Sequence, residues 1–184
     1  CLCYNIGCGA FAKSSLVKFI NGGQTIEKIK VGFLMWTKAG GVVNKGLLIE
    51  HQDLNNQASE GVFTVIMPEQ ISFQSYPFEW SYGQWRKVLY AYLQINKISL
   101  AHGMILKDAT PYNFYFEEGR AILLDTSSFD FFKEGDPWMA YRQFCSEMLG
   151  PFALMHYNGQ RWARLSQSHL RGLPLNFVSK QLPL

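Results

Sequence analysis

The sequence contains little charge and no long run of one kind of residue. Only 17% of its 184 residues are charged, and no run of lysine or arginine is longer than two. A net charge of +3 scattered in this way lacks the electrostatic footprint of a phosphate-backbone binder, so we expect no nucleic-acid partner. No apolar stretch reaches the roughly 18–20 residues that cross a bilayer, and we expect no membrane partner either.

Cysteine is scarce and poorly spaced for cross-links or zinc. Cys1, Cys3 and Cys8 crowd one end, Cys145 stands alone, and no C-x-x-C pair occurs. We expect reduced thiols in a cytoplasmic protein. The first residues, CLCYNIGCGAF, have neither a basic leader nor an initiating methionine, so they do not read as a signal peptide. We expect the chain to be a fragment of a longer protein.

What the chain does contain favours a folded α+β domain. Hydrophobic residues make up 48% and aromatic residues 15%, which is a folding composition, and the aromatic excess suggests a surface that meets another domain. Three β-branched and aromatic runs bounded by Gly and Pro predict strands within 47–80: GLLIEH, GVFTVIM and ISFQSYPFEW. We therefore divide the chain into a β-rich region, 1–80, and a mainly helical region, 81–184.

Periodicity and turn residues predict the elements of the second region. Apolar residues at helical spacing after Ser81, a plausible N-cap, predict a helix over 82–100 that Gly103 ends. The runs FYF and AILLD, separated by EEGR, predict a β-hairpin. A further amphipathic helix is expected after Asp136-Pro137, with Gly150-Pro151 breaking or kinking it.

Three polar residues between 102 and 125 form the strongest candidate site. Asp108 lies in the stretch HGMILKDATPYN (102–113), Asn113 follows five residues later, and Asp125 ends an apolar run, ILLD. A hairpin between Asn113 and Asp125 returns the second carboxylate to the first loop. Such a set suits phosphoryl transfer, in which one carboxylate orients a hydroxyl and further oxygen atoms fix magnesium against phosphates. We predict Asp108 as the catalytic residue and Asn113 and Asp125 as magnesium ligands.

These motifs resemble the protein-kinase-like fold. GMILKDATPYN is similar to the catalytic loop G-I-I-H-R-D-L-K-P-E-N, ILLDTSSF resembles the strand and metal-binding Asp of the D-F-G segment, and GDPWMAYRQF resembles the D-x-W opening of a large helix. The resemblance implies a kinase-like helical C-lobe with a truncated, β-rich N-terminal part, and ATP with magnesium as cofactors. It also places Lys107 where a cofactor phosphate would lie, although a lysine that caps a carboxylate fits the same position.

Several residues depart from the kinase pattern, and these departures affect the expected turnover of a nucleotide. Leu106 and Lys107 replace the His and Arg of H-R-D, and Thr126 and Ser127 replace the Phe and Gly of D-F-G. No glycine-rich phosphate loop and no V-A-I-K-like strand precede the site. Because kinases need both parts, nucleotide turnover is doubtful on these residues.

A second resemblance covers roughly residues 45–184. SYPFEWSYGQW, LKDATPYN, DPWMAYRQFCSEMLGPFALM and GLPLNFVSKQLP are similar to the kinase-like N-terminal region of bacterial class I S-adenosylmethionine-dependent methyltransferase-type proteins. The resemblance implies an accessory module that docks on a methyltransferase domain C-terminal to this chain. S-Adenosylmethionine would bind only in that domain. IGCG at 6–9 resembles a methyltransferase first loop, but no full Rossmann-like sheet follows it.

Two alternatives stay open beside this hypothesis. One is an active small-molecule phosphotransferase, and the other is a purely structural interaction domain. The aromatic side chains Tyr76, Phe78, Trp80, Tyr82 and Trp85 suit packing better than stacking on an adenine. His102 suits a helix C-terminus, and the other histidines show no metal-ligand spacing.

Overall fold

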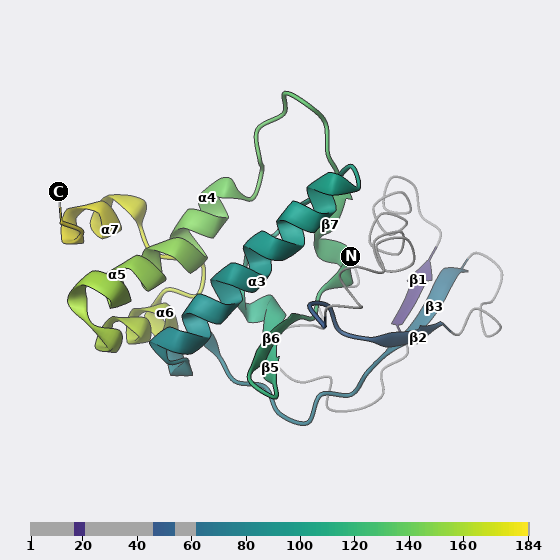
Figure 1. Cartoon of the computed structure of the whole chain (residues 1–184), viewed down its shortest axis with the longest axis horizontal. Helices are drawn as coiled ribbons and strands as arrows, with labels where there is room; N and C mark the ends of the chain where they lie inside the picture. Colours follow the sequence, from purple (N-terminus) through teal and green to yellow (C-terminus); the bar gives the residue numbers. More distant parts are fainter. Residues whose placement is uncertain (1–16, 21–45, 54–61, 184) are drawn as a thin grey trace.

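The computed structural model describes residues 17–20, 46–53 and 62–183 (Figure 1). These residues combine helices with antiparallel strands. A three-stranded antiparallel sheet of β1 (Val17–Ile20), β2 (His51–Asp53) and β3 (Val62–Pro68), in the order β1-β3-β2, lies at one end of the molecule. The helices occupy the other end. The IGCG stretch at 6–9 lies outside the described residues.

One predicted strand is wrong. Residues 71–76 are irregular, and a short 3-10 turn, η3 (Pro77–Glu79), follows them. The indole N–H of Trp80 donates to Ser75 Oγ at 2.9 Å, and that of Trp85 donates to the carbonyl of Pro77 at 3.0 Å. Two polar groups here, the Ser75 hydroxyl and the Pro77 carbonyl, are therefore hydrogen-bonded to tryptophan side chains. Pro77 also has no N–H to donate to a strand partner.

The predicted central helix is confirmed. α3 (Tyr82–Ala101) begins after Ser81, whose hydroxyl accepts the N–H of Gln84 while the Gln84 side chain accepts the N–H of Ser81. This reciprocal arrangement is a capping box. Gly103 follows the helix with a positive φ of 74°, which an L side chain rarely adopts. His102 lies at the helix end and its ring contacts the carbonyl of Ile98, as a structural role requires.

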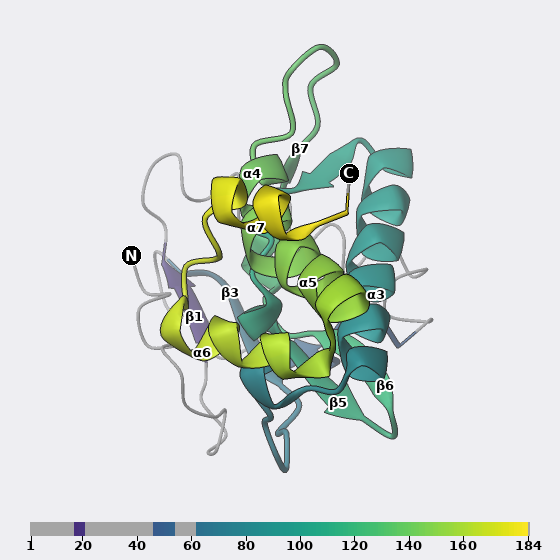
Figure 2. The same cartoon turned by 90° about the vertical axis from the view of Figure 1, so that its left-hand side faces the viewer.

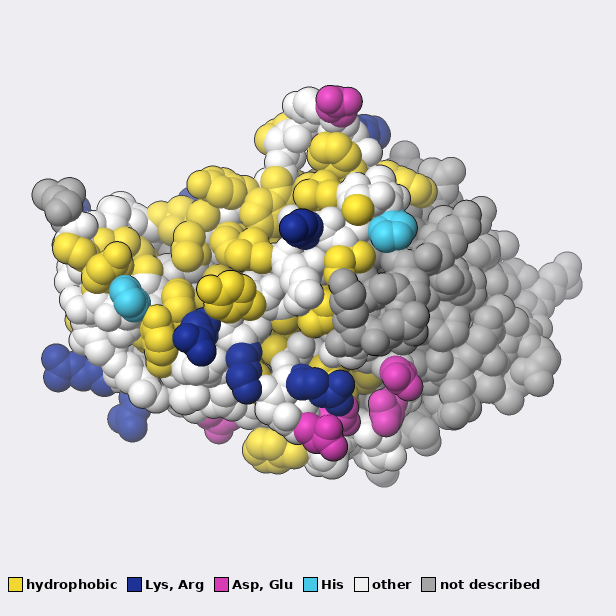
Figure 3. Space-filling model, in the orientation of Figure 1, with side chains coloured by type: hydrophobic (Ala, Val, Ile, Leu, Met, Phe, Trp, Pro, Cys, Tyr) yellow, Lys and Arg dark blue, Asp and Glu magenta, His cyan; other side chains and the backbone are white. Residues whose placement is uncertain are grey.

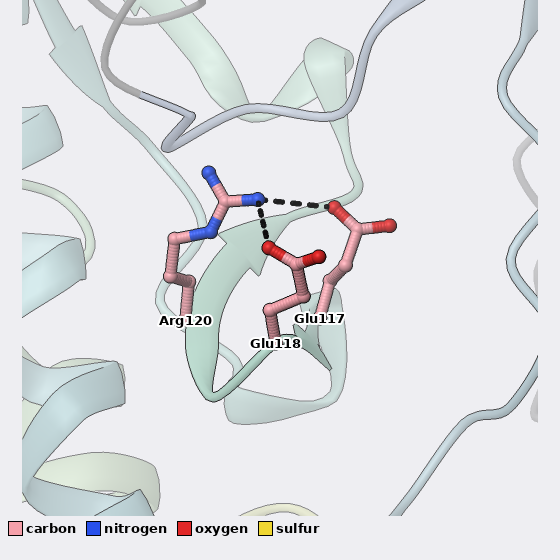
Figure 4. Close-up of polar contacts among 3 residues, drawn as sticks. All are labelled: Glu117, Glu118 and Arg120. Carbon is pink, nitrogen blue, oxygen red and sulfur yellow. Dashed lines mark hydrogen bonds and ion pairs between the residues drawn. The ribbon is translucent and has the colours of Figure 1, made fainter.

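The predicted hairpin is also confirmed. β5 (Phe114–Glu117) pairs with β6 (Arg120–Leu123) around Glu118 and Gly119, which both have positive φ, as a two-residue hairpin turn needs. Figure 4 shows the Arg120 guanidinium facing the carboxylates of Glu117 and Glu118, at 3.4 and 3.7 Å. The pairs are exposed and contribute little to stability.

A short upstream segment extends this hairpin. The N–H of Ile49 donates to the carbonyl of Leu123, the N–H of Leu123 donates to the carbonyl of Leu47, and Leu48 forms a parallel bridge with Leu123. Leu48 is 1% exposed and belongs to the same core as α3. Residues 47–49 are therefore an integral part of the larger folded unit.

The helical end differs from its predicted boundaries. The helix expected directly after Asp136-Pro137 begins only at α4 (Tyr141–Gln143), because the Trp138 side chain first turns inward and donates to the carbonyl of Leu106 at 2.7 Å. A π-helical segment, Phe144–Leu149, and α5 (Gly150–Asn158) continue without a break. After these come a 3-10 turn, η7 (Gln160–Arg164), and two short helices, α6 (Leu165–Ser168) and α7 (Leu175–Gln181).

The core lies between α3, the hairpin and the π-helical segment. α3 buries Trp85, Val88, Tyr92 and Ile95, which recur at helical spacing and are at most 1% exposed. β4 (Met104–Leu106) pairs with β7 (Phe129–Phe131) and adds Leu106 and Phe129 to this core. Among the described residues, no helix combines the length and apolar character needed to span a membrane.

Candidate functional site

The loop that carries Asp108 is fixed at several points. It connects β4 to β5 and includes the 3-10 turn η4 (Pro111–Asn113). The N–H of Lys107 donates to the carbonyl of Ser128 at 2.8 Å, and the Tyr92 hydroxyl donates to the carbonyl of Asp108 at 3.2 Å. Burial, together with the charge of Asp108, raises the pKa of Tyr92 far above its usual value, so this hydroxyl stays a donor. The backbone at Asp108 is thus held from two sides.

The Asp108 carboxylate accepts hydrogen bonds mainly through one oxygen. Oδ1 accepts the side-chain amide of Gln143 at 2.7 Å and the N–H of Thr110 at 3.2 Å. Among the described residues, Oδ2 receives only the Asn113 amide at 3.5 Å, a long contact. Asp108 is half-buried. Oδ2 is therefore the oxygen best placed to interact with another molecule.

The Asp125 carboxylate has a local partner for each oxygen. It is the N-cap of the 3-10 turn η5 (Thr126–Ser128). Oδ1 accepts the N–H and the hydroxyl of Ser127, both at 2.7 Å, and Oδ2 accepts the Ser128 hydroxyl at 2.8 Å. Asp125 thus has a full structural role as a cap.

The structure brings Asp108, Asn113 and Asp125 together in one hydrogen-bonded chain. The Asn113 amide reaches Asp108 Oδ2 and also the hydroxyl of Ser128, at 3.4 Å, and Ser128 in turn donates to Asp125. Within the described residues, no three Asp, Glu, His or Cys side chains are grouped to hold a metal ion. The magnesium role of Asn113 and Asp125, and the cofactor role of Lys107, stay predictions.

Glu147 completes the site, although no motif in the sequence points to it. This half-buried carboxyl lies on the π-helical segment, where its side chain hydrogen-bonds with Thr110 and Gln143. Burial raises the pKa of Glu147, and the nearby charge of Asp108 raises it further, while the two hydrogen bonds act in the opposite direction. Positions 108 and 147 are far apart in sequence, and no sequence pattern predicts that Asp108 and Glu147 lie near each other.

Gln143 connects the two carboxyl groups. Its Oε1 accepts the N–H of Ala109 at 3.1 Å, and its Nε2 donates to Asp108. It also hydrogen-bonds with Glu147, one helical turn further on. One amide therefore holds the Asp108 loop and Glu147 at a common position.

The π-helical turn that carries Glu147 follows from Pro151 and Gly150. Pro151 has no N–H for the helix interior, so the carbonyl of Ser146 instead accepts the N–H of Leu173 at 2.9 Å. The N–H of Gly150 donates five residues back, to the carbonyl of Cys145. A Cβ at Gly150 would lie 2.9 Å from that same carbonyl oxygen. π-Helical turns are rare and frequently occur at functional sites.

Comparison with known proteins gives two matches. The sequence model of the family described as phage lysozyme matches residues 1–53. The nodulation protein NoeA of Rhizobium meliloti (strain 1021) is 29% identical over 143 residues, which cover 72% of this chain. The chain spans only 29% of the length of that relative.

These matches overturn the family that the motifs suggested. Neither match is to a kinase or to a methyltransferase, so the interpretation as a kinase-like, ATP-binding module that docks on a methyltransferase domain is wrong. The alternatives of an active small-molecule phosphotransferase and a purely structural interaction domain are wrong as well. The structure gives the physical reason. Key residues of both kinase-like motifs have local roles: Asp108 accepts the N–H of Thr110, Pro111 opens a 3-10 turn, and Asp125 caps another. Turn chemistry alone therefore produces the spacing.

Proposed function

We propose that this protein hydrolyses a glycan by general acid–base catalysis, with Glu147 as the acid and Asp108 as the base. The observation that carries the proposal is the position of Glu147. It is half-buried near a second carboxyl group, that of Asp108, and is connected to it through Gln143. Glycoside hydrolysis commonly uses two carboxyl groups in different environments, one of which keeps its proton.

Glu147 has the properties of the acid. A leaving sugar oxygen needs a proton as the glycosidic bond breaks, and a carboxyl group supplies one only while it is protonated. Because burial raises the pKa of Glu147, this residue keeps its proton to a higher pH than an exposed glutamate does.

Asp108 has the properties of the base. In each hydrogen bond of its side chain with a described residue, the carboxylate is the acceptor, and Oδ2 is the less occupied oxygen. In the proposed step, the bond between the anomeric carbon and the leaving oxygen breaks, and Glu147 gives its proton to that oxygen. Water adds its hydroxyl to the anomeric carbon and gives its proton to Asp108. Exchange with solvent restores both carboxyl groups.

Two observations support a glycan, and an acidic one, as the substrate. The first is the match of residues 1–53 to the phage lysozyme family. The second is charge. Residues 137–184 contain a single acidic residue, Glu147 itself, and five cationic ones, all exposed: Arg142, Arg161, Arg164, Arg171 and Lys180. Lys and Arg side chains project at this helical end (Figure 3), and such a surface attracts a polyanion.

The described residues link the matched segment to the site. Leu48 and Ile49 lie within the match, and their backbone continues the hairpin that separates Asn113 from Asp125. The matched segment thus hydrogen-bonds to β6, the strand that leads into Asp125.

Release of reducing ends from purified bacterial peptidoglycan by the full chain tests the proposal. We expect Asp108→Asn and Glu147→Gln each to lower the rate by about 100-fold or more, as the loss of a general acid or base does. Glu134→Gln and Asp136→Asn, at exposed positions of the loop before α4, are the matched controls and should keep the wild-type rate. A wild-type chain that releases no reducing ends, or an Asp108→Asn variant that keeps full activity, would refute the assignment.

A further inference from the structure

The segment that follows α6 lies directly against the turn that carries Glu147. Gly172 has a positive φ of 87°. A Cβ at this position would lie 2.6 Å from Ser146 Oγ, 2.8 Å from Ser146 Cβ and 2.9 Å from Glu147 Cγ. Real Cβ atoms do not approach other atoms so closely. Position 172 therefore has room for a hydrogen atom and nothing larger.

The same segment also satisfies the backbone of that turn. The N–H of Leu173 donates to the carbonyl of Ser146, which Pro151 leaves without a helical donor. Leu173 is 2% exposed and packs with Leu154 and Val178 in a small core of its own. The segment is thus held by a backbone hydrogen bond to the π-helical turn and by the packing of the Leu173 side chain.

α7 anchors the segment to α5. A Cβ at Gly150 would lie 3.3 Å from Val178 Cγ2, which shows how closely the two elements approach. The Asn158 amide, at the end of α5, donates to the carbonyl of Gln181 at 3.0 Å. Figure 2 shows α7 lying across α5 at the helical end of the molecule. α7 and the residues before it are therefore held at both ends.

We propose that residues 172–181, here called the C-terminal clasp, position Glu147 for the reaction with Asp108, and that Gly172 is the positioning residue. This inference rests on the proposed function, because it assigns a role to Glu147. Glu147 Cγ lies directly against Gly172, and the carboxyl group of the same side chain has Thr110 and Gln143 as partners. A side chain at position 172 displaces Cγ from this place, while a hydrogen atom keeps the carboxyl group beside Asp108.

The clasp acts through position, so its effect must appear in the titration of Glu147. Burial is the largest cause of the raised pKa of Glu147. When Cγ is displaced, the carboxyl group loses burial and the charge of Asp108 together, and its pKa falls toward that of an ordinary glutamate.

Gly172→Ala in the full chain is the test, with Gly135→Ala as its matched control. Gly135 has almost the same φ, 89°, but nothing lies within 4 Å of a Cβ placed there. Both variants impose the same unfavourable backbone conformation on alanine, and only Gly172→Ala touches Glu147. The measurements are the Glu147 side-chain ¹³C titration by NMR and the pH profile of peptidoglycan hydrolysis.

We expect Gly172→Ala to lower the titration midpoint of Glu147 and to move the high-pH limb of the rate profile by the same amount. kcat should fall tenfold or more with little change in KM, and Gly135→Ala should change none of these quantities. Val178→Ala loosens the anchor of α7 without adding an atom, so it provides the same test, with a smaller shift, should Gly172→Ala fail to fold.

The outcomes separate the two proposals. An unchanged Glu147 titration in folded Gly172→Ala overturns the role of the clasp, whatever the hydrolytic activity. A shifted titration in a protein whose wild type does not hydrolyse peptidoglycan supports the clasp and refutes the proposed function.

Discussion

Replacing Gln143 by methionine should destabilise the protein by about 3 kcal/mol, because one amide serves three partners. Methionine keeps the length and the volume of the side chain but removes both polar atoms. The N–H of Ala109, a residue that is 0% exposed, then loses its acceptor, and Asp108 loses its donor at 2.7 Å. An orphaned buried N–H costs about 1–3 kcal/mol and a lost hydrogen bond to a charged group about 1.5–3 kcal/mol. Because neighbouring effects are not additive, we expect a total toward the lower end of the sum of these two ranges.

Urea unfolding followed by tryptophan fluorescence measures this change. For a chain of this length, about 3 kcal/mol corresponds to a fall of roughly 6–12 °C in Tm. Gln94→Met is the matched control, since Gln94 is exposed on α3 and the same substitution there should cost at most about 0.5 kcal/mol. Equal unfolding free energies for the two variants would refute the reasoning that Gln143 holds the site together.

The same variant has a second consequence for Glu147. The hydrogen bond from Gln143 lowers the pKa of Glu147, so its loss raises that pKa further. The proposed acid then keeps its proton to a higher pH, and the high-pH limb of hydrolysis should move upward. A limb that moves downward would contradict the assignment of Glu147 as the acid.

Two further predictions concern stability. Glu147 binds its proton more tightly in the folded chain than in the unfolded one, so its contribution is fully present below its unfolded pKa and is lost as the pH rises through its folded pKa. Glu147→Gln should therefore gain stability relative to wild type as the pH rises through that window, by about 1.4 kcal/mol for each unit by which the pKa is raised. If the free energies of unfolding of the two proteins differ by the same amount at every pH in the window, this prediction is wrong. Leu48→Ala should cost about 2–5 kcal/mol because Leu48 is 1% exposed in the main core, whereas Leu93→Ala, at a position 46% exposed, should cost far less. Similar urea midpoints for these two variants would show that residues 47–49 do not belong to the folded unit.

The sequence predicted those elements whose signals lie within a few residues. Ser81 with Gln84 and the glycine at 103 set both ends of α3, and Glu118-Gly119 set the hairpin turn. The errors occurred where distant side chains decide. Residues 71–76 have strand-like composition but are irregular. The Ser75 hydroxyl and the carbonyl of Pro77, which follows this stretch, accept hydrogen bonds from the indoles of Trp80 and Trp85. Trp138 turns into the core, so the following helix starts later than Pro137 suggests.

The family assignment failed for a related reason. A catalytic loop and an ordinary turn can share Asp, Pro and Asn at the same spacing, since Asp accepts a nearby N–H and Pro starts a turn in either setting. The convergence of Asp108, Asn113 and Asp125 was within reach of the sequence, because a hairpin of known length connects them. Their chemistry was not, since it depends on what else reaches the same place.

The sequence by itself thus determined α3, the hairpin and the loop that presents Asp108, because caps, turn residues and helical periodicity act between neighbours in the chain. Only the tertiary structure decided that Glu147 joins Asp108 and that Gly172 lies against it. Thr110, Glu147 and Gly172 are far apart in sequence, and Glu147, which is half-buried, meets the other two only because the chain folds around its side chain. The proton affinity of Glu147 follows from that burial, which no local pattern of residues encodes.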